Sequence, residues 1–168
     1  MKKYLPALVA GFGAGVLVVV PVIKSFSCCL IIPSAAVIAL ILNQKASGSS
    51  AKIDTSQALL FGLTTGLFAA LFGTFFELFI TFITKSNDLI YAYNDLVDLV
   101  NKFPVTNDIK QEVIDLSQNV VTSIKTTGFS ALYSIAIFVN NIIVDPIFGM
   151  IGGLIGAKFI NSRIDQST

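Results

Sequence analysis

Histidine and tryptophan are absent from the sequence, and charged residues are scarce. Without histidine, the chain cannot build a His-based catalytic triad, an imidazole metal site or a His-ligated haem. Only 12% of the 168 residues are charged, whereas an average soluble domain carries about 25%. The formal net charge is +1, and no Lys/Arg cluster supplies the local positive field that nucleic acid requires. The composition therefore argues against nucleic-acid binding and against a fully water-exposed surface.

Cysteine occurs only as two neighbours, Cys28 and Cys29. Adjacent cysteines rarely bridge to each other because the resulting ring is strained, and the pair lacks the spacing of metal ligands. We expect them to pack as small apolar side chains; reaction with an outside thiol or lipidation is the alternative. The rest of the sequence offers no nucleophile–base pair and no metal set. The sequence thus predicts a protein that is not an enzyme and has no cofactor.

Long apolar runs are abundant, since 54% of the residues are hydrophobic. A transmembrane helix needs about 20 mainly apolar residues. The first run follows Lys2 and Lys3 as in a signal peptide, but no clean small-x-small cleavage site follows, so we expect it to be retained. The sequence predicts an all-α, polytopic membrane protein with four transmembrane helices, at about residues 4–23, 26–42, 57–84 and 129–160.

The distribution of Lys and Arg predicts how these spans are oriented. With the N-terminus inside, only Lys24 lies in the short outer turn between the first two spans. Both termini are then cytoplasmic, in a bacterial inner membrane, and the long connection between the third and fourth spans lies outside. The basic residues at or near the cytoplasmic side are Lys2, Lys3, Lys45, Lys52, Lys158 and Arg163.

The two halves of the chain resemble each other. Residues 7–15 align with residues 58–66, where Ala, Leu and both Gly coincide, and Pro33 falls on Pro146. The alignment suggests two hairpins of the same orientation, related by an axis along the membrane normal. Chance similarity between apolar helices rich in glycine and alanine is the alternative. The two hairpins would cover residues 1–45 and about 55–160.

Residues 86–127 are the one water-compatible segment. Apolar residues recur at spacings of three and four over 89–103 and again over 109–124, which is one face of a helix in each case. Pro104 separates the two stripes, so the sequence predicts an amphipathic helical hairpin outside the membrane. The stripes either pack on each other or form a docking face for a partner or for lipid headgroups. Six of the ten acidic residues lie here, which argues against adhesion to anionic lipid.

Small residues recur at four-residue spacing within the apolar runs. They let helix backbones approach closely, which gains dispersion contacts that lipid cannot match. We expect them to pack inside one four-helix bundle, and a homo-oligomer interface is the alternative. The candidates for helix packing are Gly11, Gly15, Gly62, Gly66, Gly149, Gly152, Gly153 and Gly156.

Two carboxylates interrupt the long apolar runs, Glu77 and Asp145, and Asn140 and Asn141 lie near the second of them. Ionisable groups inside membrane spans are costly and often functional. Pro146 removes one backbone hydrogen bond and can open the helix there. These four polar residues are candidates for a site that binds a cation or relays protons. Alternatively, the repeat places both carboxylates near the outer ends of the membrane-embedded parts, where water solvates them.

The layout also resembles a known group of proteins. Its third helix begins SQALLFG at residues 56–62, an acidic helical segment follows, and the last helix ends FGMIGGLIGAK at residues 148–158. This arrangement is similar to that of small four-helix bacterial membrane proteins of unknown function, common in the Bacteroidetes and Chlorobi groups. The resemblance covers most of the chain, is one of layout, and brings no activity or site residues with it.

Taken together, these features predict a non-enzymatic accessory or scaffold protein that packs with itself or with a larger membrane complex, through the outer hairpin or the glycine faces. The alternative is a small transporter or channel subunit that uses Glu77 and Asp145. The transporter requires these two carboxylates to share a cavity, whereas the scaffold requires an exposed apolar patch on the outer hairpin or on a glycine face.

Overall fold

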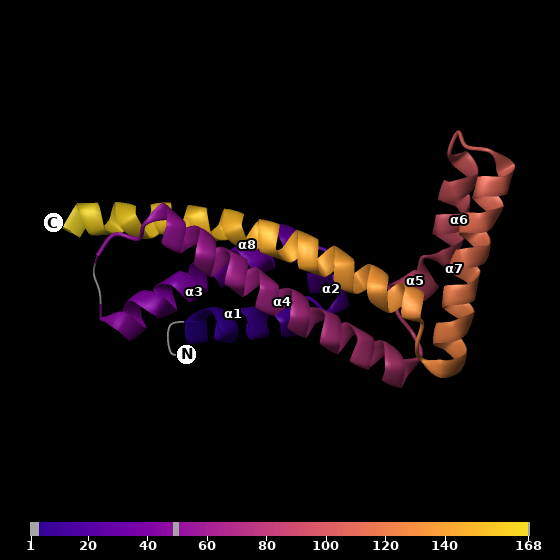
Figure 1. The fold of residues 1–168 in the computed structure, drawn as a ribbon, viewed down its shortest axis with the longest axis horizontal. Coiled ribbons are helices and arrows are strands. Elements are labelled where there is room, and N and C mark those ends of the chain that lie inside the picture. The colour runs from indigo at the N-terminus through magenta and orange to yellow at the C-terminus, as the bar shows by residue number, and fades with distance from the viewer. Residues whose placement is uncertain (1–3, 49–50, 168) are drawn as a thin grey trace. The chain divides into compact units, whose positions relative to one another are not determined.

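A computed structural model describes residues 4–48 and 51–167 of the chain, which are almost entirely helical (Figure 1). The chain forms two compact units: unit 1 comprises residues 1–76 and 137–168, and unit 2 comprises residues 77–136. All elements of the described residues are helices, so the predicted all-α class is confirmed. Among the described residues, three helical stretches are long and apolar enough to cross a membrane, namely Ser27–Ser47, Thr55–Thr84 and Ala131–Gln166.

The first apolar run of unit 1 is divided into two helices, α1 (Leu5–Leu17) and α2 (Pro21–Lys24). Proline has no N–H to donate and disfavours the helical conformation of the residue before it. Val20 is accordingly extended, with φ −77° and ψ 120°. The 13 residues of α1 rise by about 20 Å, which is less than the hydrocarbon core of about 30 Å. The expectation of one continuous helix over residues 4–23 is therefore wrong, because the chain forms two helices there.

The second apolar run starts with a π-helical turn, η2 (Ser27–Ile31), and continues as α3 (Ile32–Ser47). Pro33 is the second residue of α3, and it lacks the N–H that would continue the hydrogen bonding from η2 into α3. Gly48 ends the helix in the left-handed conformation, with φ 62°. Cys28 and Cys29 lie on η2 as free thiols, with their Sγ atoms 3.7 Å apart.

The two longest helices are α4 (Thr55–Thr84) and α8 (Ala131–Ser167). They match the third and fourth predicted runs closely, although α8 extends beyond residue 160. The helix continues through Pro146 rather than opening there. Proline removes only one hydrogen bond, and α4 packs closely against α8 at Pro146, where Gly66 contacts its backbone.

Small side chains form much of the core of unit 1, in which α1, α3, α4 and α8 run alongside one another (Figure 1). Ala7, Ala39, Ala58 and Ala69 are each fully buried. Large apolar side chains face outward instead, as Phe75 does with 61% of its surface exposed. Helices that pack through small residues and expose large apolar ones are typical of membrane proteins, because lipid covers the outer surface.

Unit 2 contains three further helices, α5 (Asp88–Tyr91), α6 (Tyr93–Lys102) and α7 (Asn107–Thr127). The Asn87 side chain accepts a 3.1 Å hydrogen bond from the Ile90 N–H and so caps α5. The helices α6 and α7 lie side by side (Figure 1). Across the turn between them, the Lys110 ammonium donates a 2.8 Å hydrogen bond to the carbonyl oxygen of Asn101.

The end of α7 contacts the end of α4 closely. Gly128 ends α7 in the left-handed conformation, with φ 78°, and a Cβ atom there would lie 2.5 Å from the carbonyl oxygen of Phe82. Lys85 ends α4 with φ 51°, and its ammonium donates a 2.9 Å hydrogen bond to the carbonyl oxygen of Thr126. Gly128 thus ends α7 before α8 begins.

Candidate functional site

Glu77, the first candidate carboxylate, has an aromatic partner in unit 2. The Tyr133 hydroxyl donates a 2.7 Å hydrogen bond to Oε1 of Glu77. Tyr133 lies in the first turn of α8 and only 8% of it is exposed, whereas Glu77 is half-buried. A buried tyrosine hydroxyl usually has a hydrogen-bond partner, and the carboxylate provides it here. The sequence carries no sign of this pairing, because residues 77 and 133 are far apart along the chain.

Asn141, the second candidate, also bonds across the two long helices. Its Nδ2 donates a 3.0 Å hydrogen bond to Oγ1 of Thr74, and its Oδ1 accepts a 3.2 Å bond from Asn140. Thr74 is buried, Asn141 is partly buried and Asn140 is exposed. An amide side chain in an apolar helix signals a polar partner on a neighbouring helix. That partner could not be named from the sequence, since three threonines of α4 are buried.

Asp145, the third candidate, is buried in unit 1 with 8% of its surface exposed. Within the described part of the chain, no residue forms a hydrogen bond or an ion pair with its carboxylate. Asp145 follows Asn141 by four residues, so both side chains lie on the same face of α8. The backbone of Asp145 packs on Gly66, where a Cβ atom would lie 2.5 Å from the Asp145 carbonyl oxygen.

Glu77 and Asp145 belong to different units. Glu77 contacts Tyr133 in unit 2, and the backbone of Asp145 contacts Gly66 in unit 1. Their sharing of a cavity stays a prediction. Among the described residues, no group of three or more His, Cys, Asp or Glu residues is arranged to hold a metal ion.

Glycines of α4 and α8 lie where the other helix leaves no room for a side chain. Gly62 and Gly149 contact each other, and Gly153 contacts the backbone of Ala58. Together with Gly66, these positions mark a seam along which the two antiparallel backbones approach closely. Close approach of this kind increases dispersion contacts between helices.

The other predicted glycines contact different helices. Gly11 and Gly15 of α1 pack on α4, where a Cβ at Gly15 would lie 2.9 Å from the Gly73 nitrogen. Gly152 and Gly156 of α8 pack on α3, at Pro33 and Val37. The glycines of α1 and of α4 that the repeat aligns thus have different partners, α4 in one case and α8 in the other. Gly73, which the sequence analysis did not single out, belongs to the α1–α4 contact.

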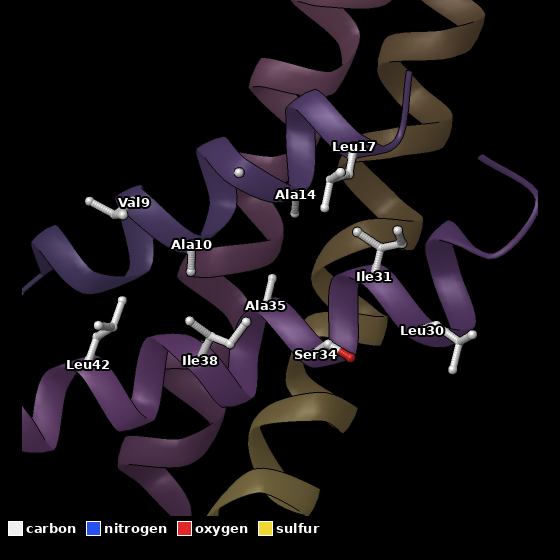
Figure 2. A pocket seen from close by; sticks show the side chains of 11 residues that line it. Val9, Ala10, Ala14, Leu17, Leu30, Ile31, Ser34, Ala35, Ile38 and Leu42 are labelled. Atoms are coloured by element: carbon white, nitrogen blue, oxygen red, sulfur yellow. The ribbon is translucent and has the colours of Figure 1, made fainter. Parts of the chain in front are cut away.

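An apolar groove runs between α1 and α3 in unit 1 (Figure 2). One part of it has a volume of about 430 Å³ and a second part has a volume of about 660 Å³, and both are lined by Val9 and Leu42. The side chains that line the first part come from α1, η2 and α3, and those of Ala10, Ala14, Ala35 and Leu42 point into the space between α1 and α3 (Figure 2). The second part is lined by Asn43 and Ser47 as well as by apolar residues.

A polar cluster links the start of α4 to the end of α8 in unit 1. The Asn161 side chain accepts a 2.8 Å hydrogen bond from the Ile53 N–H and donates a 3.0 Å bond to the Ile53 carbonyl. Beside it, Lys52 and Asp165 form a 2.7 Å ion pair. Asn161 therefore satisfies both backbone groups of a buried residue that precedes α4, and its role is structural.

The apolar stripe of α6 is half-buried, and the first half of the α7 stripe is exposed. No residue of α6 is buried, and only Val120, Val121 and Ile124 of α7 are buried. The stripes thus do not bury each other along their whole length. The exposed apolar residues at the α6–α7 turn and on the neighbouring turns of both helices are Leu99, Phe103, Val105, Ile109, Val113 and Leu116. We call these six residues the apolar tip.

No protein-family model matches the chain, and neither the curated proteins nor the solved structures contain a match.

Proposed function

We propose that this protein is a non-enzymatic integral protein of the bacterial inner membrane that serves as an accessory or scaffold subunit. Its α6–α7 pair would lie outside the bilayer and bind a partner protein of a larger membrane complex. The observation that carries this proposal is the apolar tip. Its six large apolar residues are exposed on the most polar segment of the chain.

The membrane placement is supported by three long apolar helices and by the large apolar side chains exposed on them. We place α1 and α2 in the membrane as a fourth, interrupted segment, with both termini cytoplasmic. Lys45, Lys52 and Lys158 then lie on the cytoplasmic side, in keeping with the positive-inside rule. Lys2 and Lys3, on which the same prediction relies, lie outside the described residues.

The chemistry of the tip favours a protein over a lipid surface. Residues 86–127 contain six carboxylates against three lysines, and an acidic segment is repelled by anionic headgroups. An exposed apolar patch rimmed by polar residues marks a protein interaction site in many proteins. Helices that present apolar residues at spacings of three and four suit docking against another helix.

Site-specific photocrosslinking in intact cells tests the proposal. A benzophenone amino acid is placed at Ile109 or Leu99 in the tip, and at Gln118 on the polar side of α7 as the matched control. We expect adducts with a distinct membrane protein from Ile109 and Leu99 and not from Gln118. Adducts with a second copy would favour a homo-oligomer, and equal yields from all three positions would contradict the proposal.

A second function, passage of a proton or cation, is favoured by one observation: Asp145 is buried in an apolar helix without a partner among the described residues. Buried intramembrane carboxylates often mark ion pathways. Proteoliposomes containing the wild type or Asp145→Asn, loaded with a pH-sensitive dye, test this alternative. Flux that the substitution abolishes would support it, and flux equal to that of protein-free vesicles would contradict it.

A further inference from the structure

We propose that the groove between α1 and α3 binds one acyl chain of an anionic phospholipid, with the headgroup at the end formed by Asn43 and Ser47. This inference rests on the membrane placement proposed above. It does not depend on the role of the apolar tip, which belongs to unit 2.

The shape of the groove suits a narrow, flexible chain. Its floor contains Ala10, Ala14 and Ala35, which are buried, and its rim contains half-exposed side chains such as Val9 and Ile38 (Figure 2). The two parts of the groove, about 430 and 660 Å³, fall in the range of ligand pockets, about 300–1,000 Å³. Because both parts include Val9 and Leu42, they form one continuous path along the helices.

A second helix fits this groove less well than an acyl chain does. The helices α1 and α3 contact each other and their alanines form the floor, so the groove is no deeper than its rim side chains. A helix with its side chains is about 10 Å across and would rest on the rim. Gly13 adds open space to the α1 wall, since a Cβ atom there would meet nothing within 4 Å.

The polar end determines which lipid is bound. Hydrocarbon gains no hydrophobic free energy when it moves from the bilayer to an apolar groove, so the headgroup must supply the preference. Asn43 and Ser47 line that end. Lys45, in the same helical turn, is exposed and forms no ion pair with a described residue. Lys45 precedes the lining residue Ala46, so its long side chain is within reach of a phosphate bound at this end, and basic residues that flank a membrane attract anionic lipids.

Photolabelling of the full-length protein tests the inference. The protein is reconstituted in phosphatidylcholine vesicles that contain phosphatidylglycerol with a diazirine on its acyl chain, and labelled residues are located by mass spectrometry. We expect Val9 and Ile38 to be labelled several-fold more strongly than Phe75, which is exposed on α4 outside the groove. Gly13→Leu adds a side chain at a groove position where a Cβ atom meets nothing within 4 Å, and it should lower groove labelling at least fivefold.

Headgroup preference is tested by charge removal. A second set of vesicles contains phosphatidylcholine with the same diazirine in place of the labelled phosphatidylglycerol. Lys45→Gln should reduce the ratio of phosphatidylglycerol to phosphatidylcholine labelling in the groove severalfold, whereas Lys158→Gln, the matched loss of a cation on α8, should leave it unchanged. Equal effects of the two variants, or labelling of Val9 that matches Phe75 and ignores Gly13→Leu, would overturn the inference. So would native mass spectrometry showing that Gly13→Leu converts an oligomer to a monomer, because the groove would then hold a second copy. If neither Val9 nor Phe75 were labelled in the wild type, the membrane placement itself would be overturned.

Discussion

The hydroxyl of Tyr133 donates a 2.7 Å hydrogen bond to the Glu77 carboxylate. This bond joins the first turn of α8 to α4 across 56 positions of sequence. It gives a charged group in an apolar helix a specific partner, which lowers the free-energy cost of placing that group there. Glu77 is thus first of all a structural residue of unit 2, whatever else it does.

Removal of the Tyr133 hydroxyl should destabilise the protein. Tyr133→Phe leaves the half-buried carboxylate without this donor, and we expect a loss of about 1–2 kcal/mol in the free energy of unfolding. Tyr91→Phe is the matched control, since Tyr91 is 77% exposed and its hydroxyl only accepts a bond from Ser86. Thermal unfolding in detergent micelles measures both variants. Equal effects would show that the Tyr133–Glu77 bond adds nothing to stability.

Two glycine-to-alanine substitutions should act in opposite directions. A Cβ at Gly66 would lie 2.5 Å from the Asp145 carbonyl oxygen, whereas a Cβ at Gly13 meets nothing within 4 Å. Gly66→Ala should therefore cost about 1–3 kcal/mol by forcing α4 and α8 apart. Gly13→Ala should stabilise the protein by up to about 1 kcal/mol through helix propensity. Denaturant unfolding of the two variants side by side decides the matter, and destabilisation by Gly13→Ala would contradict the open wall of the groove.

Much of the fold was predictable from the sequence because each long helix corresponds to a long run of apolar residues. The predicted run 57–84 is α4 with two residues added at its start. Hydropathy alone does not reveal the break after Leu17, because residues 4–23 are apolar throughout, whereas Pro21 stops the helix through its local backbone geometry. The pairings Tyr133–Glu77 and Asn141–Thr74 were not predictable, since no local pattern specifies which residues of two distant helices meet.

Gly128→Ala should destabilise the protein more than Gly48→Ala does. Both glycines have positive φ, 78° and 62°, so alanine is strained at either position by about 1 kcal/mol. Only at Gly128 would the new Cβ also lie 2.5 Å from a backbone atom, the Phe82 carbonyl oxygen; at Gly48 it meets nothing within 4 Å. The difference between the two losses isolates that contact, and we expect it to be at least about 1 kcal/mol. Equal unfolding midpoints would refute the close approach of α4 to the end of α7.

Asn161→Ala should loosen the segment that enters α4. Asn161 satisfies both the N–H and the carbonyl of Ile53, at 2.8 and 3.0 Å, and Ile53 is buried with 6% of its surface exposed. Alanine would leave two buried backbone groups unpaired, and each net hydrogen bond contributes about 1 kcal/mol. Amide hydrogen exchange at Ile53 should therefore accelerate by about one to two orders of magnitude, since about 1.4 kcal/mol corresponds to a tenfold change. Ser162→Ala is the control, because the Ser162 hydroxyl bonds only to the Phe159 carbonyl within its own helix. If both variants left exchange at Ile53 unchanged, the Asn161 side chain would not hold this segment, and the Lys52–Asp165 ion pair would remain as its link to α8.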